Sequence, residues 1–383
     1  MNFSLGVTRP RAKGKSAILR GLSPVVRPKC PAPSPAITVR VHHHARLSER
    51  LPALAHLAMA GEVAALSRHP NWLNVLRDGL KQDVFAIEAQ RHGETCGFLP
   101  LAFVDTMLFG RFLVSLPYLN SNGVIADSPE VQSALISRAV ELSDELNVNH
   151  LELRHEKPIE HKAINGAMAS KVHMRMALPA SNEQLWKSFS SKLRNQIRKG
   201  EKNDFRISWG GTESLDPFYA VLSENMRDLG TPVYGRSLFE SILRNFPNDA
   251  ELAVVWAGEK PISCALLLHG RRCTEVPTAS SLRDFNSTCA NMLMYRHLLD
   301  RAVERGQTLF DFGRSTVDGS TYKFKKQWGA EPTPATWQYA VRRGEIGAMR
   351  PDNPRYERMI RLWQKLPVRL TQYIGPLIVR GIP

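Results

Sequence analysis

A block of aromatic and basic residues in the last quarter of the chain is the stretch best equipped for chemistry. It reads Phe310-Asp311-Phe312-Gly313-Arg314-Ser315-Thr316 and, after a short loop, Tyr322-Lys323-Phe324-Lys325-Lys326-Gln327-Trp328-Gly329-Ala330. Acyl transfer needs a fixed cation, because its tetrahedral intermediate carries negative charge on the former carbonyl oxygen. Lysines set between rings could supply that cation from a pocket wall. A solvated basic loop whose rings belong to the core is an equal alternative.

Two further groups have chemical potential. Asp311 precedes Arg314 at the same predicted strand end, so a desolvated Asp311 could act as a general base, although a structural ion pair is favoured. The run His42-His43-His44 lacks carboxylates or cysteines at metal-ligand spacing, and we predict no metal site. The sequence has no P-loop, no GxGxxG after a strand, and no GxSxG elbow at Ser280-Ser281.

The elements that must position this block occur twice along the chain. Each half has a predicted hairpin, then a helix, then a strand. Both predicted helices contain the letters Arg-Ala-Val-Glu. We interpret this as a structural duplication, with chance coincidence as the alternative. The predicted segments are Val84–Gln90 with Cys96–Phe103, Ser128–Asn147 and His150–Arg154, then Glu251–Ala257 with Ile262–His269, Cys289–Arg305 and Thr308–Arg314.

A basic helix is predicted at the join between the two halves. Lys171–Pro179 is expected to form a strand, and Ser181 then caps a helix of about twenty residues, with Gln184 at the capping-box position. A basic helix is usually a solvated face, and contact with an anionic substrate is the alternative.

Length and charge bound the rest. The 383 residues suit two domains, and 43% hydrophobic residues suit a globular chain. Of the net charge of +15, nine positive charges fall before the first acidic residue, Glu49. Residues 1–36 are therefore expected to be a disordered, basic, Pro-rich tail. No run of apolar residues is long enough to span a membrane. Five scattered cysteines indicate reduced thiols and a cytoplasmic protein.

The block from Asp311 to Pro332 resembles the FemAB family, most of all the subgroup associated with exosortase/PEP-CTERM and exopolysaccharide systems. The resemblance covers roughly residues 40–383, and it extends to the stretches Gly97-Phe98-Leu99-Pro100-Leu101, Ser191-Lys192-Leu193-Arg194, Met226-Arg227-Asp228-Leu229-Gly230 and Thr278-Ala279-Ser280-Ser281. It implies an α/β (α+β) fold of two tandem GNAT-like domains, each with a mixed, mostly antiparallel sheet flanked by helices. The expected boundaries are 37–180, 181–345 and a closing segment 346–383 that packs on the body.

The resemblance also assigns roles within this sequence. Characterised FemAB proteins transfer aminoacyl groups from charged tRNA to cell-wall precursors. Their Phe-Lys pair, which stabilises the intermediate, corresponds to Phe324 and Lys325. Their phosphate-binding Arg corresponds to Arg236, with Arg227 as the rival. We expect Arg314 to hold another anionic part of the substrates, and Tyr322 and Trp328 to shape the pocket.

Two departures from the family leave the donor open. The long helical arm of some tRNA-using members is missing, and so is the loop that binds coenzyme A pyrophosphate through backbone N–H groups. We therefore expect an acyltransferase that uses either acyl-CoA or aminoacyl-tRNA as donor, with no bound cofactor. A binding protein on the same scaffold is the alternative function, and nucleic-acid binding is a third, since a net charge of +15 suits an anionic partner.

The expected acceptor is an amine or hydroxyl of an anionic, lipid- or nucleotide-linked glycan of the cell envelope. The closing apolar stretch Leu370–Ile382 is expected to pack on the body. Peripheral contact with the inner face of the membrane is its alternative.

Overall fold

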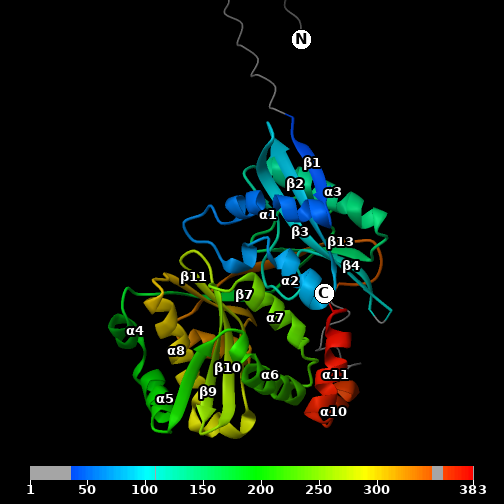
Figure 1. The fold of residues 1–383 in the computed structure, drawn as a ribbon. Coiled ribbons are helices and arrows are strands. Elements are labelled where there is room, and N and C mark those ends of the chain that lie inside the picture. Colours follow the sequence, from blue (N-terminus) through cyan, green and yellow to red (C-terminus); the bar gives the residue numbers. More distant parts are fainter. Residues whose placement is uncertain (1–35, 108, 347–356, 383) are drawn as a thin grey trace, which may run out of the picture. The chain divides into compact units, whose positions relative to one another are not determined.

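A computed structural model of the chain describes residues 36–107, 109–346 and 357–382 (Figure 1). Residues 36–383 group as one unit by their contacts. The predicted basic tail, residues 1–36, falls outside the described residues except for Ala36.

The first half of the chain, residues 37–180, contains helices and the strands of a mixed sheet. Helix α3 begins where the sequence predicts, because Ser128 accepts a hydrogen bond from the Val131 N–H and Pro129 occupies the first turn. The elements are β1 (Thr38–His42), α1 (Ala45–Ala58), α2 (Trp72–Leu80), β2 (Asp83–Arg91), β3 (Glu94–Thr106), β4 (Gly110–Val114), β5 (Ile125–Ala126), α3 (Pro129–Glu145), β6 (His150–His155) and β7 (Gly166–Ala177).

The second half, residues 181–345, begins with two short helices and then repeats the order of elements of the first half, except that β5 has no equivalent and α9 is added. They are α4 (Asn182–Ser188), α5 (Ser191–Glu201), β8 (Phe205–Gly210), α6 (Leu215–Leu229), α7 (Arg236–Asn245), β9 (Ala250–Ala257), β10 (Lys260–His269), β11 (Cys273–Ser281), α8 (Ala290–Glu304), β12 (Leu309–Thr316), α9 (Ser320–Lys326) and β13 (Glu331–Val341).

Strand pairing confirms the predicted duplication. In the first half, β2 and β3 form a hairpin, β4 pairs antiparallel with β3, and β6 pairs parallel with β4. In the second half, β9, β10, β11 and β12 pair in the same way. A helix makes the parallel crossover in both halves, α3 in the first and α8 in the second.

The two halves share one continuous sheet of thirteen strands, where the sequence suggests a sheet in each half. Its order is β1-β2-β3-β4-β6-β13-β7-β12-β11-β10-β9-β8, with β5 beside β3. Read from either end, this order passes through equivalent strands of the two halves in the same succession, with β1 equivalent to β8, β2 to β9 and β3 to β10. The two halves exchange their last strands, because β7 of the first half pairs with β12 of the second, and β13 of the second half pairs with β6 of the first. The swap pairs strand edges that would otherwise be exposed at the centre of the molecule.

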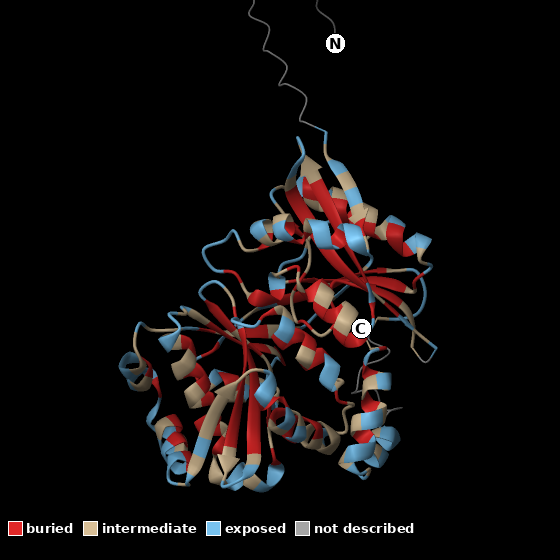
Figure 2. Ribbon diagram, in the orientation of Figure 1, coloured by how far each residue is buried: buried red, intermediate tan, exposed pale blue. Residues whose placement is uncertain are grey.

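Three large apolar clusters and a small one around Phe112 support the sheet, and burial follows its strands and the inner faces of its helices (Figure 2). One cluster lies under α3, a second lies under α5 and α8, and the third joins α1 and α2 to α6 and α7. The equivalent helices α2 and α7 pack closely at Gly79, where a Cβ atom would lie 2.8 Å from the Cα of Leu238.

The basic helix predicted after Ser181 is two helices. Ser181 does cap α4, by accepting the Gln184 N–H. The chain then breaks at Phe189, which is extended and packs its ring on Trp328 with centroids 5.5 Å apart. Ser190 starts α5 by accepting the Leu193 N–H. Burial of the Phe189 ring and the second cap together outweigh continuation of one helix.

The carboxy-terminal residues form α10 (Glu357–Trp363) and α11 (Val368–Val379). Helix α11 lies against α6, with Thr371, Gly375 and Val379 buried. Gln372 donates a hydrogen bond to the hydroxyl of Ser223 in α6. Among the described residues, no helix is both long and apolar enough to cross a membrane.

Candidate active site

The candidate site lies where the parallel strands β11 and β12 separate. They pair at Cys273 with Leu309, at Thr274 with Phe310 and at Glu275 with Asp311, and at no later position. Two carboxylates therefore stand side by side at the last paired position. Beyond it, β12 bulges between Asp311 and Arg314, with Gly313 at a φ of 77°. Separating strands open the sheet and leave backbone groups free to face a ligand.

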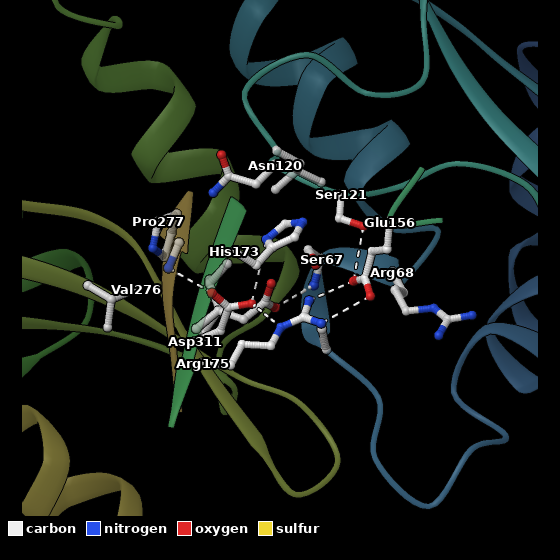
Figure 3. A pocket seen from close by; sticks show the side chains of 15 residues that line it. Ser67, Arg68, Asn120, Ser121, Glu156, His173, Arg175, Val276, Pro277 and Asp311 are labelled. Atoms are coloured by element: carbon white, nitrogen blue, oxygen red, sulfur yellow. Dashed lines mark hydrogen bonds and ion pairs between the residues drawn. The ribbon is translucent and has the colours of Figure 1, made fainter. Parts of the chain in front are cut away.

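A small cavity lies at this point and is lined by residues from both halves of the chain (Figure 3). Its volume of about 20 Å³ has room for one water molecule. We call it the carboxylate cavity; its polar side chains are those of Ser67, Arg68, Asn120, Ser121, Glu156, His173, Arg175, Glu275 and Asp311.

Glu275 is the carboxyl group in the cavity whose pKa is raised. Protein atoms surround it, while part of its surface stays open to the cavity. Burial, reinforced by the nearby charge of Asp311, raises its pKa to about 7. The backbone N–H of Ser67 donates to its Oε2 at 2.9 Å and orients it. A carboxylate poised near neutral pH, beside a cavity, suits a general base.

Arg175 on β7 holds the other two carboxylates of the cavity. Its Nε donates to Asp311 at 2.8 Å, and its two terminal nitrogens donate to Glu156 at 3.0 and 2.6 Å. Burial alone would raise the pKa of Glu156, but the hydrogen bonds from Arg175 outweigh it and hold that pKa at about 2. Asp311 also accepts the backbone N–H of Gly313 at 2.7 Å. Of Glu156 and Glu275, Glu275 is therefore the carboxyl group whose pKa lies near 7.

His173 lines the same cavity as a neutral, buried ring. It is 1% exposed, and burial lowers its pKa. Among the described residues, neither ring nitrogen has a hydrogen-bond partner, and Nδ1 lies 3.9 Å from Asp311 Oδ2. A buried imidazole without partners is costly, so we expect it to bind a water or a ligand atom in the cavity.

Lys325 sits at the bulge of β12. Its Nζ donates to the carbonyl oxygens of Gly313 and Arg314 at 3.2 and 3.0 Å. Burial lowers its pKa to about 8, against the opposing charge of Asp311. The ammonium group has three N–H donors, so one remains beyond these two hydrogen bonds. The structure therefore brings Lys325 and Asp311, two residues predicted from the sequence, to the same strand end.

The predicted aromatic residues lie in an apolar cluster outside the cavity lining. Phe324 packs edge-on against Tyr295 with ring centroids 5.0 Å apart, and Tyr322 is half-buried beside the same cluster. Trp328 is 1% exposed. It borders a separate groove of about 850 Å³, together with Phe189 and Arg175. These rings support α9, and thereby the position of Lys325.

The three predicted arginines occupy different places. Arg314 stacks on Trp337, with its guanidinium carbon 3.4 Å from the ring centroid. Arg236 pairs with Asp216 and Glu240 at the start of α7. Arg227 donates to Asp228 and to the carbonyl of Leu366, ahead of α11. Neither Arg236 nor Arg227 lines the carboxylate cavity.

Glu275, His173 and Arg175 were not predicted as site residues from the sequence. His173 and Arg175 alternate along a predicted strand and so share one face, which is the pattern that marks a polar site inside a sheet. Glu275 is a lone acid in β11 between Thr274 and Val276. Its significance depends on Asp311, which is its neighbour only through strand pairing.

Comparisons with known proteins place this geometry in a known fold. Residues 187–326 match the family described as the acetyltransferase (GNAT) domain, so the chain contains a GNAT-type domain from α4 to α9. The first half repeats the topology of that domain. No curated protein matches the sequence.

Solved structures of low sequence identity share the fold. FemX matches with a TM-score of 0.61 at 16% identity, over 79% of this chain and 97% of that chain. L-PGS from Bacillus licheniformis matches with a TM-score of 0.52 at 11% identity, over 87% and 96%. The C-terminal domain of a protein assigned as lysylphosphatidylglycerol synthetase, from Agrobacterium fabrum, matches with a TM-score of 0.51 at 11% identity, over 77% and 92%.

Proposed function

Since residues 187–326 match the GNAT acetyltransferases, we propose that this chain is an acyltransferase whose reaction takes place at the carboxylate cavity. The observation that carries the proposal is the pair Glu275 and Asp311 at the separation of β11 and β12, with a pKa of Glu275 near 7. A base of this pKa can take a proton from an attacking amine or hydroxyl at neutral pH.

In the proposed reaction the acceptor attacks the donor carbonyl directly. Glu275 takes the proton of the acceptor O–H or N–H as the new bond to carbon forms. The tetrahedral intermediate then collapses, the bond to the donor's leaving group breaks, and Glu275 passes the proton that it took from the acceptor to the leaving group. Arg175 donates hydrogen bonds to both Asp311 and Glu156 beside Glu275. The nearby charge of Asp311 raises the pKa of Glu275 and so strengthens it as a base.

Lys325 is the proposed cation for the oxyanion. Two of its N–H groups are held by the bulge carbonyls, and the third is free to donate to the developing negative charge. Phe324, Tyr322 and Trp328 fix α9, on which Lys325 lies. This differs from the expectation from sequence only in that the rings support the lysine from behind.

The acceptor would enter from the first half of the chain. A pocket of about 620 Å³ shares Arg68, Ser121 and Glu156 with the carboxylate cavity. Arg68 and Lys157 are exposed cations on its wall. These two cations support an anionic acceptor such as a lipid- or nucleotide-linked glycan of the cell envelope. As part of this proposal, the protein belongs to the subgroup associated with PEP-CTERM systems. Arg236 and Arg227 are less suited to hold it, since both bind partners elsewhere.

The first experiment concerns the donor. Calorimetric titration with acyl-CoA thioesters, and separately with charged and uncharged tRNA, should give saturable binding of one donor class. Incubation of that donor with candidate acceptors should then give an acylated product by mass spectrometry. Saturable binding of an acceptor without turnover of any donor would favour the binding-protein alternative.

A substitution tests the role of the cation. Lys325→Met removes the charge but keeps the length of the side chain, so we expect transfer to be lost while the chain still folds. Loss of two hydrogen bonds to buried carbonyls costs about 1–3 kcal/mol, which a thermal unfolding curve will show. Near-normal turnover of the folded variant would refute the role proposed for Lys325.

A further inference from the structure

An apolar surface at the carboxy end has no partner among the described residues. The described part of the chain has nine exposed large hydrophobic side chains. Five of them lie in α10 and α11, and a sixth lies next to the residues that follow α11. We call these six the C-terminal apolar face: Met107, Met359, Leu362, Leu370, Tyr373 and Leu377. Scattered exposed hydrophobic residues are ordinary in proteins, whereas a concentration of them indicates an interaction surface.

Helical spacing makes this face regular. Leu370, Tyr373 and Leu377 follow one another at intervals of three and four along α11, so they lie on one side of the helix. The opposite side, with Thr371 and Gly375, is buried on the body. In α10, Met359 and Leu362 have the same spacing. The protein thus anchors one side of α11 and leaves a second apolar side in water.

A segment distant in sequence adds to the same surface. Gly381 follows α11 and touches Thr106, because a Cβ atom at Gly381 would overlap that side chain. Met107 follows Thr106 in the chain and is fully exposed where β3 turns toward β4. Figure 1 shows the carboxy end of the chain beside these two strands. The face is therefore built from the tertiary structure and extends beyond one helix.

The charge around the face is strongly positive. Residues 357–382 carry Arg358, Arg361, Lys365, Arg369 and Arg380, all exposed, against the single acid Glu357. Glu357 pairs with Arg361. An apolar helix face bordered by cations complements the interface of a bilayer that contains anionic lipid.

We propose that the C-terminal apolar face docks this protein on the surface of an anionic membrane. Helix α11 would lie in the plane of the interface, with Tyr373 and Leu377 in the headgroup region and the arginines at the phosphates. The proposal does not rest on acyl transfer, since it concerns a surface separate from the carboxylate cavity.

The test is co-sedimentation of the full chain with vesicles of phosphatidylcholine alone or with added phosphatidylglycerol. We expect partitioning onto the anionic vesicles at least about tenfold above the neutral ones, because each cation near anionic lipid contributes roughly a fivefold gain. The gain should shrink as salt is raised. Equal partitioning onto both vesicles, or none, would overturn the proposal.

Paired variants separate this face from the basic tail, which could also bind anionic lipid. Tyr373→Ser with Leu377→Ser should lower partitioning at least about tenfold, since it removes two large apolar side chains from the interface. The matched control, Val63→Ser with Val317→Ser, changes two hydrophobic residues exposed elsewhere and should leave partitioning unchanged. An unchanged Tyr373/Leu377 variant would show that the tail carries the binding. Self-association of the full chain without lipid, abolished by that variant, would show a protein interface and also overturn the proposal.

Discussion

The two halves of the molecule share one topology but differ at the position where a strand meets its parallel neighbour. In the first half Val114 pairs with Glu152, and in the second half Glu275 pairs with Asp311. Glu152 is satisfied within its own strand by Arg154, at 2.7 Å. The first half therefore has one neutralised carboxylate where the second has two, and burial beside Asp311 raises the pKa of Glu275 to about 7.

A second contrast concerns the arginines that the sequence pattern makes equivalent. Arg154 and Arg314 both stack on Trp337, at 4.0 and 3.4 Å from the ring centroid. Trp337 belongs to β13, which lies near the centre of the palindromic sheet. The duplication thus places two equivalent arginines on one ring at the centre, while the carboxylate pair Glu275 and Asp311 occurs in the second half.

The sharpest way to remove this contrast is Glu275→Val, which gives the second half the side chain found at Val114. Loss of the general base should lower the transfer rate by about 10²–10⁴. The control Val114→Ala should cost about 1–3 kcal/mol of stability and leave turnover per folded molecule unchanged. Turnover is measured with the donor that the titrations select, and Glu275→Gln, which still accepts from Ser67, guards against a folding defect. Full activity in both Glu275 variants would place the base elsewhere.

Arginine substitutions compare how each half holds its carboxylates. Arg175→Met leaves Asp311 and Glu156 without their shared cation and should cost about 3–5 kcal/mol in urea unfolding. Arg154→Met should cost a similar amount of stability, since it leaves the buried carboxylate of Glu152 without its charge partner. Only the Arg175 variant should also change the pH dependence of transfer. Identical pH profiles of the transfer rate for the two variants would show that Arg175 does not influence the carboxyl group that takes part in the reaction.

Measurements of stability as a function of pH can compare Glu275 with Glu251, a carboxyl group whose ionised form is stabilised by the fold. The pKa of Glu275 lies near 7 in the folded chain, above its unfolded value of 4.5. Ionisation therefore weakens the fold as pH rises through 7. Glu275→Gln should match the wild type at pH 4 and exceed it at pH 8 by up to about 3 kcal/mol.

The matched control for that measurement is Glu251→Gln. Burial alone would raise the pKa of Glu251, but hydrogen bonds from His269 and Arg301 hold it at about 2. Its stabilisation is present above its unfolded pKa and is lost as pH falls toward 2. Glu251→Gln should therefore destabilise the chain at pH 7. Shifts of the same sign in both variants would mean that Glu275 is not held protonated by its surroundings.

The smallest expected effect is the shape of the pH–rate profile. Glu275 must be ionised to act as a base, so the rate should rise through its pKa near 7. Lys325 must be protonated to act as a cation, so the rate should fall above its pKa near 8. The ratio kcat/KM should therefore peak narrowly between these values. A rate that stays constant from pH 6 to pH 9 would argue against both assignments.

Local sequence signals predicted much of the fold. The hairpins around Gly93 and Gly258 follow from glycine in the left-handed conformation between alternating apolar runs. The start of α3 follows from Ser128 and Pro129. The single helix expected after Ser181 was wrong, because burial of Phe189 against Trp328 is a tertiary effect that no local signal encodes.

The candidate site was predictable only in part. Asp311 and Lys325 fall in one dense block of sequence, and the structure joins them at one strand end. Glu275 is 36 residues away from Asp311 in sequence and Arg175 is 136 residues away, and strand pairing makes them neighbours. The exchange of β7 and β13 between the halves is a long-range pairing that periodicity along the chain cannot reveal.

The sequence by itself determined the duplicated elements, their caps and turns, and the cation-bearing segment after β12, because these depend on residues close together in the chain. Only the tertiary structure decided which carboxyl group has a pKa near 7. The pKa of Glu275 depends on burial and on the charge of Asp311 across a strand pair. Both terms arise when distant segments meet and exclude water, so they exist in the folded protein alone.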